Sequence, residues 1–198
     1  IRTGPDLIWQ TETFGFHMVE MEFRQHSVVH TRALADIREH GIHGELAPMT
    51  REVLDTFRAI GSIQKRYGTK MARRYIISFT KSAQHVADVY ELAQLAFAHA
   101  EDVPMLDVIP LFEQLEDLEG CVDVLEEMLK LPAVQARLAQ TGRRMKVMLG
   151  YSDSSKDAAH HRHARPALRT GAHRRVGGEK RHRPRAHARP RWCRGPWR

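Results

Sequence analysis

RYIISFTKSAQHVADVYELAQLAFAHA, residues 74–100, joins a short apolar run to a longer amphipathic segment. The run RYIISFT (74–80) is short and rich in β-branched and aromatic residues, which predicts a buried strand. Residues 82–100 have the apolar spacing of a helix, and Ser82 is a suitable N-cap. A buried strand followed directly by a helix is the repeating unit of α/β folds.

The same alternation extends outward through the first 158 residues. The expected strands cover residues 15–24, 74–80, 106–113 and 146–153, and the expected helices cover 50–68, 82–100, 116–131 and 132–142. We expect Thr50 to cap the first of these helices and Gly68 to end it. In the first strand, one face would carry Val19, Met21 and Phe23, and the other Glu20, Glu22 and Arg24. The order β-α-β-α-β-α-β favours a parallel sheet or barrel with crossover helices.

The last fifth of the chain differs in composition from the rest. Residues 159–198 hold 12 Arg and one Lys against a single acid, Glu179, whereas residues 1–158 hold 18 basic and 23 acidic residues. The basic segment has no Ile, Phe, Tyr or Met. It lacks the apolar surface needed to offset the entropy of ordering, so we expect residues 159–198 to be a disordered tail after a domain at 1–158.

Other features limit where the protein acts. Two cysteines, Cys121 and Cys193, are too few for a disulfide framework, which fits a reducing compartment such as the cytoplasm. No apolar run is long enough to span a membrane, and no signal peptide is recognisable. The chain opens on IRTGPDLIWQ, with no initiating Met and no obvious N-terminal element, so we expect it to begin inside a domain.

Polar side chains follow each expected strand. They are Arg24 after the first, Thr80 and Lys81 after the second, Glu113 after the third, and Asp153 and Lys156 after the fourth. Active sites of parallel α/β folds form where the strands end, although loops are polar in any case. Two carboxylates suit Mg²⁺ or Mn²⁺, and two cations suit a phosphate or carboxylate. This combination favours metal-assisted chemistry on a phosphorylated small molecule.

Three motifs in the same order resemble the phosphoenolpyruvate carboxylase family. They are LGYSDSSKDA (149–158), FGFHMVEMEFRQHS (14–27) and IPLFEQLEDLEG (109–120). The resemblance covers about residues 5–158. It implies a partial TIM-type β/α barrel with extra helices, taken from a cytoplasmic, homotetrameric enzyme that depends on Mg²⁺ or Mn²⁺. Such enzymes convert phosphoenolpyruvate and bicarbonate to oxaloacetate and phosphate through carboxyphosphate and an enolate.

The motif match also implies roles for individual residues. Glu113 and Asp153 correspond to metal ligands, Arg24 to a contact of the substrate phosphate or bicarbonate, and Lys156 to a cation of the same site. Asp157 would orient Lys156, or would simply cap the next helix. For Arg24 the alternative is an ion pair with Glu20 or Glu22 along its own strand.

The chain also departs from the family pattern. The histidine-bearing Thr-Ala-His-Pro-Thr-Glu segment and the later His-Gly-Arg-Gly-Gly loop are absent, and the resemblance ends after Ala158. One allowed back-translation of residues 188–198, read one base later, spells His-Gly-Arg-Gly-Gly. We therefore interpret residues 159–198 as out-of-frame sequence, and we expect the 198-residue chain alone to be inactive.

Two other interpretations of the basic segment remain. An Arg-rich arm binds nucleic acid or other polyanions, which would make the chain a non-enzymatic binding module. The six histidines of the segment suggest metal binding, but the spacing of His160, His161 and His163 matches no closed metal site.

Overall fold

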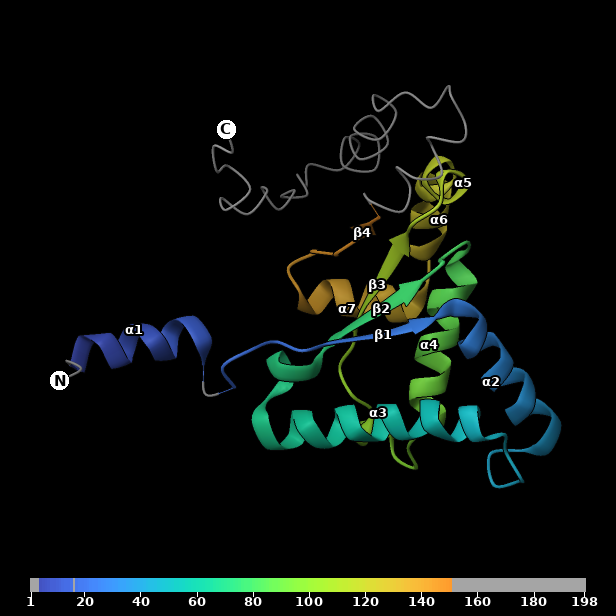
Figure 1. The fold of residues 1–198 in the computed structure, drawn as a ribbon, viewed down its shortest axis with the longest axis horizontal. Coiled ribbons are helices and arrows are strands. Elements are labelled where there is room, and N and C mark those ends of the chain that lie inside the picture. Colours follow the sequence, from blue (N-terminus) through green and yellow to red (C-terminus); the bar gives the residue numbers. More distant parts are fainter. Residues whose placement is uncertain (1–3, 16, 151–198) are drawn as a thin grey trace, which may run out of the picture.

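The computed structural model describes residues 4–15 and 17–150, which form a parallel sheet with helices (Figure 1). The strands are β1 Glu22–His26, β2 Arg74–Ser78, β3 Asp107–Phe112 and β4 Met148–Leu149. They pair in the order β1-β2-β3-β4, and all three pairs are parallel. The predicted α/β class and parallel strand order are confirmed. The basic segment 159–198 lies outside the described residues.

Helices make every connection between the strands. The β1–β2 connection contains α2 Ser27–His40, α3 Pro48–Tyr67 and the 3-10 turn η1 Thr69–Ala72. The β2–β3 connection contains α4 Ala83–Leu95 and η2 Ala100–Asp102, and the β3–β4 connection contains α5 Leu115–Glu119, α6 Cys121–Met128 and α7 Pro132–Gln140. In the described part of the chain, no helix is both long and apolar enough to cross a bilayer.

The main core lies between one face of the sheet and the helices. Alternate strand residues point to this side, among them Tyr75, Ile77, Val108 and Phe112, and they pack on α2, α3, α4 and α6. Phe57 of α3 stacks on Tyr75 with ring centroids 5.2 Å apart. The buried side chains on this face account for most of the favourable free energy of folding, because apolar burial scales with the area removed from water.

A smaller apolar cluster occupies the opposite face of the sheet. It consists of Ile76, Ile109 and Leu111, with the half-buried Met148 packed against them. Ile76 lies opposite Arg24 on one side and opposite Ile109 on the other in the strand register. Arg24 therefore belongs to the sheet face that the main helical core does not use.

The first strand begins later than its sequence pattern predicts. β1 starts at Glu22 rather than at residue 15, and Val19 and Met21 are exposed instead of sharing a buried face with Phe23. Glu22 pairs with Arg74, the first residue of β2, and the η1 turn precedes Arg74. The neighbouring strand thus offers no extended backbone upstream of Glu22, which limits how far the ladder extends.

Several helix boundaries also differ from the predictions. The predicted helix at 50–68 begins at Pro48 with Ala47 as its N-cap, so Thr50 is a buried first-turn residue and not the cap. Gly68 ends this helix at φ 90°, as predicted. The helix expected over 116–131 is divided into α5 and α6 at Gly120.

Two helices had no counterpart in the sequence prediction. α2 begins with Ser27 and includes His30 among its buried residues, so its inward stripe is partly polar and its apolar period is weak. α1, Gly4–Phe14, has no buried residue, and it extends away from the sheet (Figure 1). The sequence pattern indicated no obvious element near the N-terminus, and the structure adds α1 there.

Candidate active site at the carboxyl edge of the sheet

Arg24 lies two residues before the end of β1 and is exposed. Its Nη2 atom is 3.5 Å from Sδ of Met148 in β4. Glu20 and Glu22 instead pair with Arg73 and Arg74 at the other end of the strands. The predicted alternative, an ion pair of Arg24 with Glu20 or Glu22, is wrong, and within the described residues the exposed Arg24 guanidinium has no carboxylate partner.

Glu113 follows the last residue of β3 directly and is half-buried. Its carboxylate has no hydrogen-bond or ion-pair partner within residues 4–15 and 17–150. The end of β4 lies against it, because the Gly150 amide donates to the Phe112 carbonyl at 2.8 Å. A Cβ atom at position 150 would be 3.0 Å from Cα of Glu113, so a glycine permits this close approach. Glu113 thus presents a free oxygen donor beside the end of the fourth strand.

The loop after β2 contributes less than the sequence predicts. Thr80 is buried, and its hydroxyl donates to the Ile77 carbonyl at 2.8 Å, so it serves the local turn. Lys81 is exposed, and its backbone amide donates to His85 Nδ1 at 3.3 Å. Of the polar residues predicted to follow β1, β2 and β3, the side chain of Thr80 is therefore engaged in the local turn, whereas those of Arg24, Lys81 and Glu113 form no ion pair within the described residues.

The other predicted site residues, Asp153, Lys156 and Asp157, lie outside the described residues. Within the described part, no three His, Cys, Asp or Glu side chains form a group able to hold a metal ion. Mg²⁺ is commonly held by one or two carboxylates and several waters, and a single hard oxygen from Glu113 fits that pattern. The donor set that the structure describes is therefore compatible with Mg²⁺ or Mn²⁺ and unsuited to a closed Zn²⁺ site.

The sequence prediction did not anticipate a set of contacts that links the ends of β1, β2 and β3. The His26 ring stacks on Phe79 with centroids 4.6 Å apart and planes 21° apart. Ser27 Oγ donates to the Phe79 carbonyl at 2.8 Å. Phe79 has φ 55°, which is uncommon for a residue with a side chain. Strained backbone of this kind is a feature that can mark a functional turn, and it cannot be recognised from the sequence alone.

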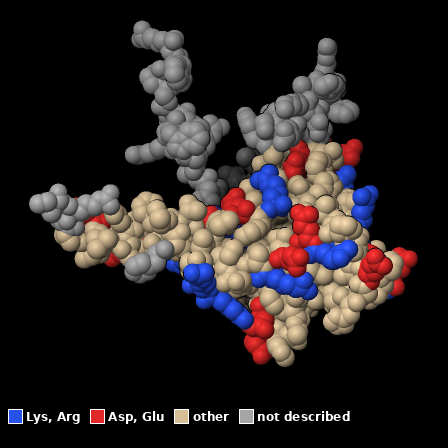
Figure 2. All heavy atoms as spheres, turned by 60° about the horizontal axis from the view of Figure 1, so that its bottom comes forward, with Lys and Arg blue, Asp and Glu red and all other residues tan. Residues whose placement is uncertain are grey.

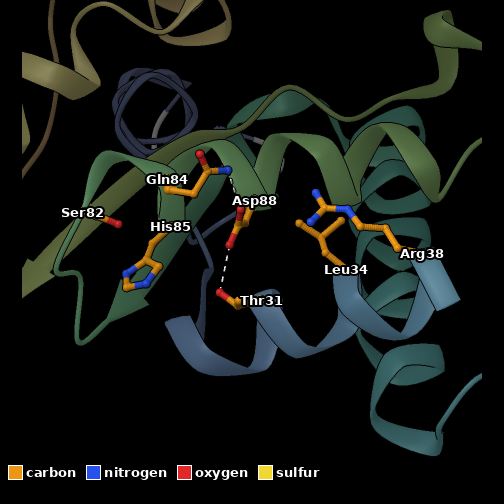
Figure 3. A pocket seen from close by; sticks show the side chains of 7 residues that line it. All are labelled: Thr31, Leu34, Arg38, Ser82, Gln84, His85 and Asp88. Carbon is orange, nitrogen blue, oxygen red and sulfur yellow. Dashed lines mark hydrogen bonds between the residues drawn. The ribbon is translucent and has the colours of Figure 1, made fainter.

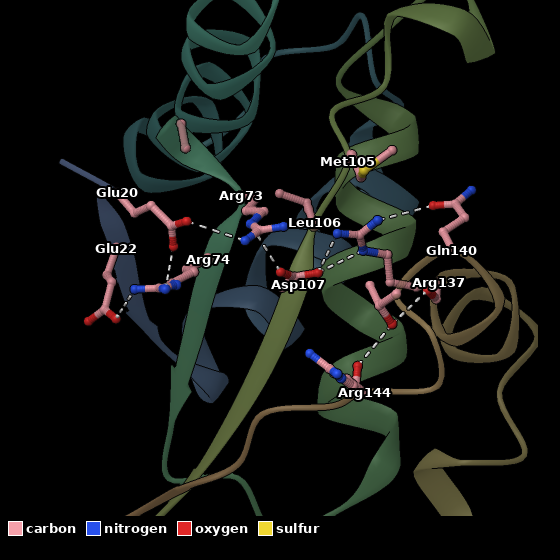
Figure 4. A network of polar contacts seen from close by, with 12 residues as sticks. Glu20, Glu22, Arg73, Arg74, Met105, Leu106, Asp107, Arg137, Gln140 and Arg144 are labelled. Atoms are coloured by element: carbon pink, nitrogen blue, oxygen red, sulfur yellow. Dashed lines mark hydrogen bonds and ion pairs between the residues drawn. The ribbon is translucent and has the colours of Figure 1, made fainter. Parts of the chain in front are cut away.

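An ion-pair network occupies the opposite, amino edge of the sheet (Figure 4). Asp107 Oδ1 accepts from Nε of Arg137 at 2.7 Å and lies 2.7 Å from its Nη2, while Arg73 Nε lies 3.4 Å from Asp107 Oδ2. Burial lowers the pKa of the neighbouring Lys146, and the Arg74 charge lowers it further. The three carboxylates of this network are all engaged in ion pairs with arginines that join the beginnings of β1, β2 and β3.

A cavity of about 230 Å³ lies between α2 and α4 (Figure 3). Asp88 lines it, but Thr31 Oγ1 and Gln84 Nε2 already donate to its two oxygens at 2.9 and 2.8 Å. Arg38, at the other end of the cavity, is paired with Glu91 at 3.1 Å. The charged groups of this cavity are therefore satisfied internally, and it does not include Arg24 or Glu113.

The surface shows no concentrated basic patch in the view of Figure 2, where Lys and Arg side chains intermingle with Asp and Glu. The excess of positive charge belongs to residues 159–198, outside the described part. Nothing on this face of the described residues favours a nucleic-acid interface over a small-molecule site.

Comparison with known proteins identifies the family. The family model for phosphoenolpyruvate carboxylase matches residues 38–162. The chain belongs to the phosphoenolpyruvate carboxylase family. A phosphoenolpyruvate carboxylase from Ralstonia nicotianae is 34% identical over 183 residues, covering 74% of this chain and 19% of that protein. The phosphoenolpyruvate carboxylase of Gloeobacter violaceus is 34% identical, covering 77% of this chain and 20% of its own length.

Family membership agrees with the three motifs at 14–27, 109–120 and 149–158. The chain spans about a fifth of the length of the phosphoenolpyruvate carboxylases that it matches. It therefore contains one segment of the family's protein, and two of that segment's four predicted site residues, Arg24 within β1 and Glu113 after β3, lie in the described part.

Proposed function

We propose that this chain is the part of a phosphoenolpyruvate carboxylase that binds substrate phosphate and a divalent metal ion. The enzyme would join phosphoenolpyruvate and bicarbonate to give oxaloacetate and phosphate, as a carbon–carbon lyase in anaplerotic carbon fixation. The observation that carries the proposal is that one parallel sheet, in a chain of this family, carries the exposed guanidinium of Arg24 in β1 and, directly after β3, the Glu113 carboxylate, which has no partner among the described residues.

The arrangement of the sheet supports a partial TIM-type barrel. Four parallel strands in sequential order, each followed or preceded by helices, would be half of an eight-stranded barrel. The Arg24 contact with Met148 crosses from the first strand to the fourth on the face opposite the helices, as expected if that face is the concave interior. The remaining strands would come from the rest of a longer protein.

The chain's own residues would perform three tasks. Arg24 would bind and orient the phosphate of phosphoenolpyruvate or the bicarbonate oxygens, because a guanidinium forms paired hydrogen bonds with such groups. Glu113, with Asp153, would hold Mg²⁺ or Mn²⁺. The bound ion would supply positive charge next to the enolate and phosphate oxygens. Lys156 would add a second cation for the negative charge that develops there.

Predictions from the sequence that concern the whole enzyme remain predictions. These are a homotetramer, a cytoplasmic location and a requirement for Mg²⁺ or Mn²⁺. The chain alone is expected to make no oxaloacetate, since half of a barrel leaves strand edges unpaired and the two histidine-bearing loops of the family are absent from it.

The proposal is tested by grafting residues 5–158 into the Ralstonia nicotianae relative in place of the matching segment. Oxaloacetate formation is followed by coupling to NADH oxidation with malate dehydrogenase. We expect the graft to be active, and Arg24→Gln to lower kcat/KM by about 100-fold or more, because an electrostatic contact to the reacting group is lost. Glu113→Gln should raise the Mg²⁺ concentration needed for half-maximal rate.

Two matched controls make the test specific. Arg38→Gln and Glu127→Gln remove exposed charges on the helices, and both grafts should keep the activity of the unsubstituted one. An active graft whose rate and metal requirement are unchanged by both Arg24→Gln and Glu113→Gln would show that the site has been assigned wrongly.

A further inference from the structure

The turn after β2 lies between the two residues that the proposed function requires. β2 is the strand between β1, which carries Arg24, and β3, whose last residue directly precedes Glu113. The turn begins at Phe79, where the backbone leaves the strand at φ 55°. The turn contacts the end of β1 through the His26 ring and the end of β3 through the Leu111 carbonyl.

Contacts hold the turn on its β1 side. The His26 ring stacks on Phe79, and Ser27 Oγ donates to the Phe79 carbonyl at 2.8 Å. His26 Nδ1 also accepts the amide hydrogen of Val28 at 3.1 Å, which caps the first turn of α2. The His26 ring is therefore held by two contacts, the hydrogen bond from the Val28 amide and the stack on the Phe79 ring.

Further contacts hold the turn on its β3 side. The Thr80 amide donates to the Leu111 carbonyl at 3.3 Å, and the Gly150 amide donates to the carbonyl of Phe112, the residue before Glu113. Backbone in the left-handed region persists for a residue with a side chain only where its surroundings compensate the strain. Here the compensating contacts run from β1 to β3 through Phe79 and Thr80.

We propose that His26 is a positioning residue, which acts through its stack on Phe79 to set the separation between Arg24 and Glu113. The inference rests on the proposed function, since it assigns the stack the task of coupling the phosphate site to the metal site. If Arg24 holds the phosphate and Glu113 the metal ion, their spacing decides whether the two ligands bind cooperatively.

The test measures cooperativity directly on the 198-residue chain. Mn²⁺ affinity is determined from the electron paramagnetic resonance signal of free Mn²⁺, with and without saturating phosphoenolpyruvate. The ratio of the two dissociation constants is the coupling factor, which we expect to be about tenfold in the unsubstituted chain. Residues 159–198 are the same in every variant, so anion binding by their arginines cancels in the comparison.

Three substitutions separate the stack from the cap and from backbone strain. His26→Asn retains a capping side chain but loses the stack, so coupling should fall to less than twofold while most of the thermal stability remains. His26→Phe retains the stack and loses the cap, so coupling should survive with a lower Tm. Phe79→Gly relieves the φ 55° strain and loses the stack, so coupling should fall without a matching loss of Tm.

A matched histidine control is available in His43, which is exposed in the loop between α2 and α3. His43→Asn should leave both Tm and coupling unchanged. Coupling that is unaffected by His26→Asn and Phe79→Gly would overturn the positioning role. So would a coupling factor of one in the unsubstituted chain, if Mn²⁺ binding still depends on Glu113 and phosphoenolpyruvate binding on Arg24. Ligand binding that is independent of both residues would instead overturn the proposed function, and the inference with it.

Discussion

Nη2 of Arg24 lies 3.5 Å from Sδ of Met148, across 124 residues of sequence and from the first strand to the fourth. Between them lie Ile76 and Ile109, two of the three buried residues of the second cluster. One face of the sheet therefore carries the second apolar cluster and, beside it, the exposed guanidinium of Arg24. The aliphatic part of the Arg24 side chain can pack along this cluster while its charged end stays exposed.

The second apolar cluster should contribute strongly to the stability of the fold. Ile76 is 1% exposed, so Ile76→Ala removes buried methyl groups and leaves a cavity. We expect a loss of about 2–4 kcal/mol in the free energy of unfolding, measured by urea denaturation. Leu149→Ala, at a residue 37% exposed in β4, is the control and should cost less than about 1 kcal/mol. Equal effects would mean that this sheet face is not a second core.

Stability should decrease as the solution becomes acidic, because of His30. This residue is fully buried, its Nε2 is 2.8 Å from the Tyr75 hydroxyl, and burial lowers its pKa to about 4. The unfolded state, with a pKa near 6.5, binds the proton first, so stability is full above pH 6.5 and is lost as pH falls toward 4. The loss from this group should reach about 3 kcal/mol.

The measurement is urea unfolding at a series of pH values from 7.5 to 4. His30→Leu should flatten the decline between pH 6.5 and 4, although it also removes the partner of Tyr75. His43→Asn serves as the exposed control and should leave the slope unchanged. The assignment to His30 fails if His30→Leu has the same pH dependence as the unsubstituted chain.

The ion pairs at the amino edge should matter more than those on the helices. Asp107 accepts two close contacts from Arg137, and their side chains are only 18% and 12% exposed. Asp107→Ala leaves the partly buried Arg137 without its carboxylate partner, and we expect it to lower the free energy of unfolding by about 3 kcal/mol. Glu127→Ala breaks the exposed pair with Lys130 and should cost less than about 1 kcal/mol. Urea denaturation of both variants makes the comparison.

The fit of Gly150 against Glu113 should control metal binding. In Gly150→Ala the new Cβ atom would lie 3.0 Å from Cα of Glu113, so one of the two backbones must move. We expect Mn²⁺ affinity, measured as above, to fall by about tenfold, as for the loss of a group that orients a metal ligand. Gly4→Ala places its Cβ in open space and should not change affinity. Unchanged Mn²⁺ affinity in Gly150→Ala would argue against a metal ligand at Glu113.

Local patterns predicted some elements well and others poorly. The buried strand that includes Ile76 and Ile77, the Gly68 helix end and the order of strands and helices follow from apolar periodicity and turn chemistry. The sequence pattern did not predict α2, because buried polar residues such as His30 interrupt the apolar stripe of this helix. The predicted start of β1 was wrong because a strand extends only as far as the neighbouring strand supplies extended backbone for pairing. Before β2 the chain forms the 3-10 turn η1 instead.

The sequence by itself determined the α/β class, the family and the chemical identity of Arg24 and Glu113 as candidate ligands, because these depend on residue type, short-range periodicity and motif order. Only the tertiary structure decided that Arg24 avoids Glu20 and Glu22 and reaches Met148, and that His26 meets Phe79. It also decided that Gly150 lies against Glu113. The physical reason is that strand register and the crossover helices bring together residues separated by tens of positions, and no local pattern along the chain records which of them will touch.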